Sequence, residues 1–291
     1  MTSVLYDVPG PRARARNLVL SLVGVAIVVA VGWYVYRKFD ETGQWASEKW
    51  EPFLDGDIWA NFILPGLGGT LKAAALAGVL AMVFGLVFAV GRMSSVKPIA
   101  WLAATVIEFF RAVPLLIMMI FLWLAPTKLF DADANVFMAV VIALMLYNGS
   151  VIAEIVRAGV QSLPRGQNEA GLSVGLTRGQ TMRAILLPQA LRSMLPAIVA
   201  QLIVLLKDSA LGYIIGYAEL LRQANNIATS NNNVVQSLIV IAAIFIAINM
   251  ALGALANWIE RRTRRTGHTA GPVGEAANVP PAAGMAGTTT I

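Results

Sequence analysis

The stretch 168–188, NEAGLSVGLTRGQTMRAILLP, is polar and rich in glycine, and it separates two apolar runs at 136–156 and 187–206. Each run has about 20 residues, which at roughly 1.5 Å per residue is long enough to cross a hydrocarbon core of about 30 Å. Lipid offers no hydrogen bonds to backbone amides, so such runs must be helices. The stretch therefore predicts two transmembrane helices joined by a structured polar loop.

The loop itself predicts two short helices. Pro164 and the residues after it suit a helix that begins near Arg165, and Gly175 interrupts that helix. Thr177, with Gln180 three residues later, has the form of a capping box for the second helix. The 3.6-residue period places the apolar side chains of the second helix on one side: Met182, Ile185 and Leu186. Pro188 marks the start of the next span.

The composition predicts the same class for the whole chain. It has 291 residues, of which 57% are hydrophobic and only 13% charged, and the mean hydropathy is +0.69. We expect an all-α polytopic protein of the plasma (inner) membrane with six transmembrane helices, a five-helix core plus one N-terminal helix. The expected spans are Leu18 to Tyr36, Leu67 to Val90, Ile99 to Leu124, Val136 to Val156, Leu187 to Leu206 and Val234 to Ile259. The first resembles a signal peptide, but it is too long and lacks a cleavage site of small residues, so it is expected to stay as an anchor.

The basic residues predict the orientation. With a cytoplasmic N-terminus, the inside segments hold most of the 22 Lys and Arg residues: Arg12, Arg14, Arg16, Arg92, Lys97, Arg157, Arg165, Arg178, Arg183, Arg192, Arg261, Arg262, Arg264 and Arg265. The outside segments are acid-rich: Asp40, Glu41, Glu48, Glu51, Asp55, Asp57, Asp131 and Asp133. The positive-inside rule therefore predicts that both termini are cytoplasmic. The same rule accounts for the net charge of +6, so nucleic-acid binding is the weaker interpretation of that charge.

The chain divides into four expected parts. They are a cytoplasmic tail at 1–17, an extra helix and external connector at 18–61, a transmembrane domain at 62–260 with a cytoplasmic loop at 158–186, and a tail at 261–291 that is first basic and then disordered. The chain has no cysteine, and its single histidine, His268, lies in that tail. No metal site is expected. An enzyme would need a nucleophile and a base that converge, and the sequence shows no such pair, so we do not expect an enzyme.

Charges within or near the spans are costly and need partners. Glu108 and Arg111 are three residues apart on one helix face, as are Glu154 and Arg157, so each can pair within its helix or with a neighbour. Structural bracing is favoured for both pairs over contact with a substrate. Lys207 and Asp208 are adjacent and point about 100° apart, so each needs a partner on another helix, a water-filled cavity or the outer surface. A bracing or interfacial role is favoured for them over contact with a zwitterionic amino acid.

Polar residues inside the spans mark a candidate substrate pathway. Asn148, Ser150, Gln201 and Asn249 need hydrogen-bond partners away from water, so they should face other helices or a cavity. Ordinary bonding between helices explains each one alone. Together with Lys207 and Asp208 they permit a polar seam.

The loop also carries a family resemblance. Its pattern resembles the signature loop of permease subunits in bacterial ATP-binding-cassette importers, and it is formed here by Glu169, Ala170, Gly171, Gly175, Ile185, Leu187 and Pro188. The spacing between these residues agrees with that of the family's signature loop throughout. Gly171 replaces the usual second alanine of that pattern, and we expect it to be a tolerated variation, since glycine costs roughly 1 kcal/mol of helix propensity but stays small.

Further segments are similar to the polar amino-acid branch of that family, and most similar to actinobacterial glutamate-uptake permeases. They are FFRAVPLLIMMIF at 109–121, AEIVRAGVQSLPRGQNEA at 153–170 and LPQALRSMLPAIVAQLIVLLKDSAL at 187–211. The similarity covers about residues 62–258. Residues 1–60 and the tail lie outside it.

The resemblance implies a function and a set of partners. The loop at 158–186 would be the coupling loop, which docks in a groove of a separate ATPase subunit, with Glu169 as its charged contact and Gly175 as its hinge. The other partners would be a second homologous permease, a second ATPase copy, an external solute-binding protein, lipid and a polar amino acid. No phosphate-binding glycine-lysine loop is present, so ATP and Mg would belong to the ATPase and no cofactor to this chain.

A secondary amino-acid transporter or channel that works alone is the alternative. Such a carrier is expected to show paired broken spans or an internal repeat, and the sequence shows neither. The importer and the secondary carrier differ in whether transport requires an ATPase partner.

Overall fold

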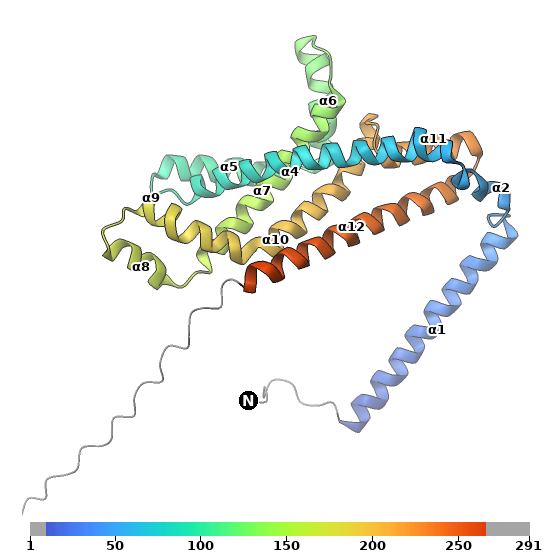
Figure 1. The fold of residues 1–291 in the computed structure, drawn as a ribbon, viewed down its shortest axis with the longest axis horizontal. Coiled ribbons are helices and arrows are strands. Elements are labelled where there is room, and N and C mark those ends of the chain that lie inside the picture. The colour runs from blue at the N-terminus through green and yellow to red at the C-terminus, as the bar shows by residue number, and fades with distance from the viewer. Residues whose placement is uncertain (1–9, 266–291) are drawn as a thin grey trace, which may run out of the picture.

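The computed structural model describes residues 10–265, and these fold into helices joined by short turns (Figure 1). Residues 1–9 of the expected N-terminal tail and residues 266–291 of the expected C-terminal tail, including His268, lie outside the described residues. The elements are α1 (Pro11–Glu41), α2 (Ser47–Trp50), η1 (Glu51–Leu54), α3 (Gly56–Ile58), η2 (Trp59–Ile63), α4 (Leu64–Arg92), α5 (Lys97–Ala112), α6 (Leu115–Phe130), α7 (Val136–Gln161), α8 (Arg165–Ser173), α9 (Arg178–Thr181), η3 (Met182–Leu186), α10 (Leu187–Asp208), η4 (Ser209–Ile215), α11 (Leu220–Asn231) and α12 (Val234–Arg265). The all-helical prediction is confirmed.

Small residues hold the centre of the bundle together, where α4 and α7 make its most extensive contact. One face of α4 is a buried stripe of Ala73, Ala77, Ala81, Gly85 and Ala89, spaced four residues apart. A Cβ atom on Gly85 would lie 2.7 Å from Ile152 Cγ2 of α7, so the two helices approach more closely there than a larger side chain would permit. The stripe sets the position of α7, which supplies more residues to the main buried core than any other helix.

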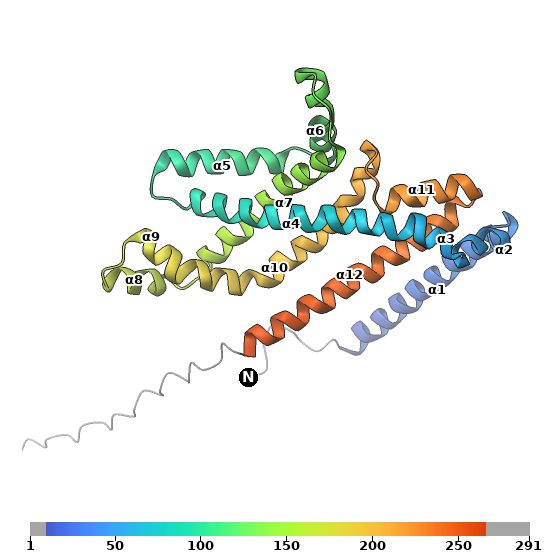
Figure 2. The same cartoon turned by 45° about the horizontal axis from the view of Figure 1, so that its top comes forward.

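The apolar run at 99–124 is two helices and not the single span that the sequence predicts. Helices α5 and α6 meet at a bend of 99° (Figure 2), and α6 projects away from the bundle. Val113, between them, has extended backbone angles (φ −77°, ψ 125°). Pro114 follows it, and a proline disfavours helical angles in the preceding residue, which explains the break. An apolar run continues across Pro114, so hydropathy alone does not reveal the bend.

Five helical segments in residues 10–265 are long and apolar enough to cross a membrane, and there are six if the bent α5–α6 pair counts as one span. The five segments overlap five of the expected spans, and the bent α5–α6 pair overlaps the sixth, Ile99 to Leu124. The N-terminal helix α1 has no buried residue and leaves the bundle (Figure 1). Its end is fixed to the connector, where Trp45 donates from Nε1 to the backbone oxygen of Tyr36 at 3.4 Å.

The two ends of the bundle differ. At one end, the loop end, α8 and α9 lie beside the turn between α4 and α5 (Figure 2). At the other, the connector end, α2, η1 and α3 lie near α11 and the start of α12. Asn233 donates from Nδ2 to the backbone oxygen of Lys49 at 3.0 Å, and Gln236 donates from Nε2 to that of Gln44 at 2.6 Å. These bonds attach the connector to the start of α12.

Candidate functional site

The coupling loop folds as the sequence predicts, with a helix, a glycine break and a second helix. Gly175 has a φ of +85°, which glycine adopts at little cost. Its N–H donates to Leu172 O at 3.0 Å, and the N–H of Leu176 donates to Gly171 O at 3.2 Å. This pair of bonds is a Schellman motif, which ends α8 and turns the chain toward α9.

The capping box that begins α9 is confirmed. The Thr177 side chain accepts from the N–H of Gln180 at 3.3 Å, and the Gln180 side chain accepts from the N–H of Thr177 at 2.8 Å. Each bond satisfies a donor that has no partner inside the helix. The start of α9 is therefore fixed by its own sequence.

Gly171 has a packing role that its interpretation as a tolerated variation missed. The residue is buried, and a Cβ atom on it would lie 2.6 Å from Thr181 Cγ2 and 2.9 Å from Thr181 Oγ1. Thr181 itself is fully buried and donates from Oγ1 to Thr177 O at 3.1 Å. The usual alanine would collide with this side chain, so glycine here permits α8 to pack directly on α9.

The second helix of the loop runs into α10 without a break. Residues 182–186 form a π-helical turn, in which the N–H of Leu187 donates to Met182 O. This wider turn accommodates Pro188, which lacks an N–H and whose ring crowds the carbonyl four residues earlier. The face predicted for this segment also forms, with Leu186 buried, Met182 and Ile185 partly buried, and Arg183 exposed. Helix α9, the π-helical turn and α10 thus form one continuous helical segment.

The outer surface of α8 combines charge and apolar area. Glu169 and Ala170 are exposed, and Glu169 forms no ion pair with any side chain that the structure describes. Leu172 is 40% exposed and Val174 is 76% exposed beside them. A cavity of about 880 Å³ lies between the loop and the α4–α5 turn, and its lining includes Glu169 and three basic residues: Arg165, Arg178 and Arg183. Such a surface suits a protein partner better than a small apolar ligand.

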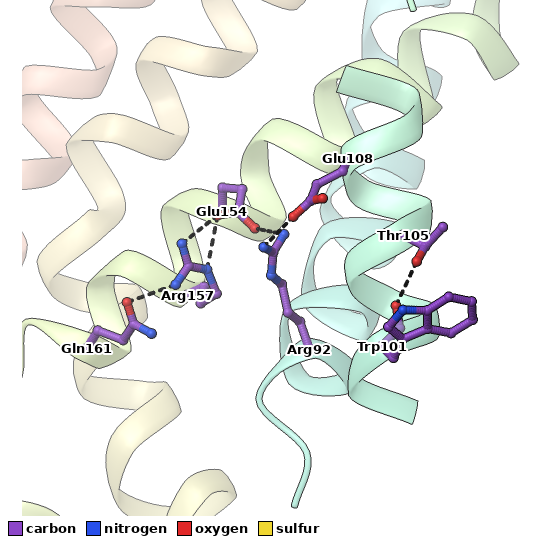
Figure 3. A network of polar contacts seen from close by, with 7 residues as sticks. All are labelled: Arg92, Trp101, Thr105, Glu108, Glu154, Arg157 and Gln161. Carbon is purple, nitrogen blue, oxygen red and sulfur yellow. Dashed lines mark hydrogen bonds and ion pairs between the residues drawn. The ribbon is translucent and has the colours of Figure 1, made fainter. Parts of the chain in front are cut away.

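An ion network joins α4, α5 and α7 near the loop end (Figure 3). Arg92 contacts Glu154 at 2.8 Å through Nη1 and Glu108 at 2.7 Å through Nη2. Arg157 donates to the second oxygen of Glu154 at 2.7 Å and to Gln161 at 2.9 Å. The Glu154 side chain is 16% exposed and that of Arg92 is 21% exposed, so the centre of the network is shielded from solvent.

The four charged residues singled out in the sequence are thus not two separate pairs. Glu154 and Arg157 pair within α7, whereas Glu108 pairs with Arg92 and not with Arg111. Arg111 is exposed and forms no ion pair in the described part of the chain. Sequence reasoning assigned Arg92 only to the orientation rule, because nothing in its local spacing points to partners 16 and 62 residues away.

Three of the expected pathway residues come together between α7 and α10. Gln201 donates from Nε2 to Asn148 Oδ1 at 2.7 Å, and Asn148 donates from Nδ2 to Leu144 O at 3.1 Å. The Asn148 side chain also lies near enough to the carboxylate of Asp208 to interact with it. We call Asn148, Gln201 and Asp208 the polar cluster. Gln201 and Asp208 lie on α10, the helix that continues from the loop at 158–186, and Asn148 lies on α7.

The remaining polar candidates lie elsewhere. Ser150 donates to Leu146 O at 2.7 Å, and Asn249 donates to Phe245 O at 2.6 Å, so each bonds to its own helix. The Oδ1 atom of Asn249 is buried without a partner among the described residues. Lys207 is exposed, and it lies close enough to Asp208, its neighbour in sequence, for the two charges to interact.

At the connector end, a carboxylate that the sequence reasoning missed fixes α11 on α4. Glu219 is fully buried and caps α11, accepting from the N–H groups of Leu221 at 2.7 Å and Arg222 at 2.6 Å. Burial raises the pKa of the Glu219 carboxyl to about 7, although these two bonds favour its charged form. An acid directly before a helix is the signal that could have identified it.

Two further contacts hold α11 and the residues before it on α4. The N–H of Leu220 donates to Thr70 Oγ1 at 3.1 Å, and the hydroxyl of Tyr217 donates to Gly69 O at 2.8 Å. A Cβ atom on Gly69 would lie 2.2 Å from Ala218 O, so only glycine fits at this crossing. Helix α11 is therefore held firmly on the first third of α4.

Comparison with known proteins identifies a family. Residues 81–265 match the sequence model of the binding-protein-dependent transport system inner membrane component. The glutamate transport system permease protein GluD of Corynebacterium glutamicum is 47% identical over 224 residues, which cover 76% of this chain and 82% of GluD. The glutamate/aspartate import permease protein GltK of Escherichia coli is 33% identical over 69% of this chain and 93% of GltK.

The fold agrees with this assignment. A crystal structure of an amino acid ABC transporter with histidines aligns with a TM-score of 0.66 and 37% identity, over 70% of this chain and 95% of that one. The alignment leaves about a third of this chain uncovered.

Proposed function

The chain belongs to the inner-membrane components of binding-protein-dependent transport systems, and on that premise we propose that it translocates glutamate. As a permease of an ATP-binding-cassette importer it is a multi-pass protein of the inner membrane, and ATP hydrolysis belongs to a separate subunit. The substrate is proposed from the 47% identity to GluD and the similarity to GltK, whose names specify glutamate and glutamate or aspartate.

The observation that carries the mechanism is the continuous helix from the coupling loop to the polar cluster. The proposed ATPase contact is the exposed surface of α8, with Glu169 as its charged group and Ala170, Leu172 and Val174 around it. Gly175 fixes the angle between α8 and α9, while Gly171, Ile185, Leu187 and Pro188 fix how the loop packs and enters α10. ATPase closure would move α8 and α9, and α10 would carry that displacement to Gln201 and Asp208.

The proposed substrate pathway passes the polar cluster. Asn148 and Gln201 supply amide groups and Asp208 a carboxylate, which together can bind the ammonium and carboxylate groups of an amino acid. Ser150 stays in the proposal only as a neighbour on α7, since its hydroxyl already bonds Leu146 O. The ion network of Arg92, Glu108, Glu154 and Arg157 is assigned to bracing, and Arg111 to a contact outside this chain.

The proposed orientation puts the loop end in the cytoplasm. Basic residues cluster there, at Arg92, Arg157, Arg165, Arg178 and Arg183, whereas the connector carries Glu48, Glu51, Asp55 and Asp57. The positive-inside rule then gives cytoplasmic termini. Residues 1–17 and 261–291 form the tails, 18–61 the added helix and connector, and 62–260 the permease domain.

The family implies a complex with an ATPase and a binding protein. We propose two ATPase copies, a second homologous permease beside this one, and an external solute-binding protein that delivers the amino acid at the connector end. The exposed apolar residues of α1 and α12 would face lipid or these partners.

Affinity purification of this chain from its native membranes in mild detergent, followed by mass spectrometry, tests the proposed assembly. An ATPase subunit and a second permease should remain bound. A chain that purifies alone and transports after reconstitution without ATP would instead support the secondary carrier.

A further inference from the structure

Three arginines of the loop at 158–186 line one cavity. The cavity, of about 880 Å³, lies between this loop and the turn from α4 to α5 (Figure 2), and the arginines are Arg165, Arg178 and Arg183. No ion pair or side-chain hydrogen bond joins any of the three to another residue that the structure describes. Each guanidinium offers five N–H donors, so the cavity is bordered by many donors that are free to bind a ligand.

The lining of this cavity has a net positive charge. Glu169 is the one acid among the described residues that line it, so three positive charges and one negative charge leave +2. Neutral hydroxyl and amide side chains complete the polar part of the lining: Ser94, Ser95, Gln161 and Asn168. Guanidinium groups bind phosphate through paired N–H donors, so an anion with several acceptor oxygens fits this part of the cavity.

The packing of the loop holds its second helical segment in place beside the cavity. One face of this segment meets α8, where a Cβ atom on Gly171 would lie 2.6 Å from Thr181 Cγ2. Another face lines the cavity at intervals of four residues, with Arg178, Met182 and Leu186. The charged end of that face is at Arg178, and it becomes apolar toward α10.

The wall formed by the bundle is also apolar. It consists of residues at or next to the ends of α4, α5 and α7: Val90, Met93, Ile99, Val160 and Leu163. The cavity is therefore cationic on the side of the loop and apolar on the side of the spans. A ligand that fits both sides carries an anionic group and a hydrocarbon chain.

The cavity adjoins a surface that suits contact with lipid. Ile99 lines the cavity and is half exposed, and the next turn of α5 also exposes Trp101 and Leu102. The Trp101 side chain is 71% exposed and points away from the ion network (Figure 3). Tryptophan is enriched at the depth of the lipid headgroups, and the ends of three spans lie beside the cavity. Lipid phosphates are expected at this depth.

We propose that the cavity binds the phosphate group of an anionic phospholipid through Arg165, Arg178 and Arg183, with the acyl chains along Ile99 and the exposed side of α5. Basic pockets beside transmembrane helices are known to bind such headgroups, and the volume falls within the range of about 300–1,000 Å³ for small-molecule sites. A lipid held here contacts both the loop and the α4–α5 turn. It therefore braces the loop against the membrane domain.

This inference goes beyond the proposed function and does not depend on the substrate. It also uses a different surface from most of the proposed ATPase contact, since Leu172 and Val174 lie outside the lining of the cavity. Glu169 belongs to both. The ATPase and the lipid can thus occupy the two sides of the loop at the same time.

The test uses native mass spectrometry of the purified permease–ATPase complex after removal of its lipids in detergent. Phosphatidylglycerol and phosphatidylcholine with the same acyl chains are titrated separately, and the affinity for the first bound lipid is measured. The variants are Arg178→Gln, Arg178→Lys, Arg183→Gln and the double Gln variant. Arg192→Gln is the matched control, because it removes an exposed arginine of α10 that does not line the cavity. The yield of intact complex checks the folding of each variant.

The wild-type complex should bind phosphatidylglycerol at least tenfold more tightly than phosphatidylcholine, whose choline group the positive lining repels. Arg178→Gln and Arg183→Gln should each weaken phosphatidylglycerol binding by about tenfold, the effect of one lost charge-assisted hydrogen bond, and the double variant by more. Arg178→Lys keeps the charge but not the paired donors, so it should lose less than Arg178→Gln. Arg192→Gln should bind as the wild type does.

Four results would overturn the lipid site. They are equal affinity of the wild type for the two lipids, unchanged phosphatidylglycerol binding in the double Gln variant, an equal loss in Arg192→Gln, and displacement of the lipid by millimolar inorganic phosphate. The last result would assign the cavity to a free anion. Absence of a bound lipid in the intact complex would count with the first, because it would mean that the ATPase fills the cavity.

The proposed function is tested separately in the same preparation. Wild-type complex in proteoliposomes, supplied with ATP and glutamate-loaded binding protein, should accumulate glutamate. If it does not, the glutamate importer is wrong whatever the arginine variants show. If it does and the double Gln variant binds phosphatidylglycerol normally, only the lipid site is wrong.

Discussion

Gly171 and Thr181 lie so close that the methyl group of an alanine at position 171 would be 2.6 Å from Thr181 Cγ2. The contact joins α8, which presents Glu169, to the helix that continues into α10. The geometry of the coupling loop thus depends on the absence of one side chain.

Gly171→Ala should loosen this loop. Overpacking in a buried site costs about 1–3 kcal/mol, which exceeds the roughly 1 kcal/mol gained from the better helix propensity of alanine. Hydrogen exchange measured by mass spectrometry over residues 165–186 should become faster in the variant.

Two comparisons make that test specific. Gly166→Ala lies on the same helix with no atom within 4 Å of its Cβ position, so it should slow exchange or leave it unchanged. Adding Thr181→Ala to Gly171→Ala should restore part of the protection. Equal protection in Gly171→Ala and Gly166→Ala would refute the packing role.

Reversal of charge at Glu169 should uncouple transport. Glu169→Lys replaces the proposed ATPase contact on an exposed surface, so the chain should still insert and assemble its helices. Glutamate uptake should fall by tenfold or more, on the order of a lost interfacial charge contact. Gly175→Pro should act similarly, because proline cannot adopt the φ of +85° found there.

The control for Glu169→Lys is Glu48→Lys, which makes the same charge change at an exposed position of the connector. It should leave uptake near the wild-type rate. Full uptake by Glu169→Lys would remove the basis for its assigned role.

Arg92→Gln should destabilise the bundle more than Arg111→Gln does. Arg92 bridges Glu108 and Glu154 across three helices, and its loss leaves a partly buried carboxylate with one partner fewer. The expected cost is about 1–3 kcal/mol, between those of exposed and buried ion pairs. Arg111 forms no ion pair with the described side chains, so its replacement should change the thermal midpoint of the purified chain little. Equal midpoints for the two variants would show that the network does not brace the helices.

The contribution of Glu219, which caps α11, to the stability of the fold should depend on pH. The pKa of Glu219 in the folded chain is about 7, above its ordinary value of 4.5, so the folded state binds more protons between those values. Its contribution to stability is therefore fully present at low pH and is lost as the pH rises through 7. The thermal midpoint should be higher at about pH 5.5 than at about pH 8, and Glu219→Gln should reduce the difference.

Glu48→Gln, at an exposed carboxyl, is the matched control for this pH response. Tyr217, whose pKa is raised by burial and by Glu219, titrates above this range and does not contribute to it. A pH response that persists in Glu219→Gln would assign the effect to another group.

Local signals in the sequence predicted much of the fold. Apolar runs of sufficient length identified the spans, and Gly175 with the Thr177 capping box identified the two helices of the coupling loop, because these motifs act within a few residues. The break after Val113 was missed because apolar residues continue on both sides of Pro114. Hydropathy does not report backbone angles.

The candidate site was only partly predictable. Asn148 and Gln201 were identified as polar residues in apolar helices, but their mutual bond depends on how α7 and α10 pack. The partners of Arg92 lie on two other helices, and Gly171 is explained only by the position of Thr181. Such contacts depend on the tertiary arrangement and have no local sequence signal.

The most direct test of the central claim is glutamate uptake by proteoliposomes that contain the purified complex, with glutamate-loaded binding protein outside and ATP or a non-hydrolysable analogue inside. The importer mechanism predicts uptake with ATP only, and loss of that uptake when the permease carries Glu169→Lys. Uptake that proceeds with the analogue, or that requires an ion gradient and not ATP, would contradict the coupling of this permease to ATP hydrolysis.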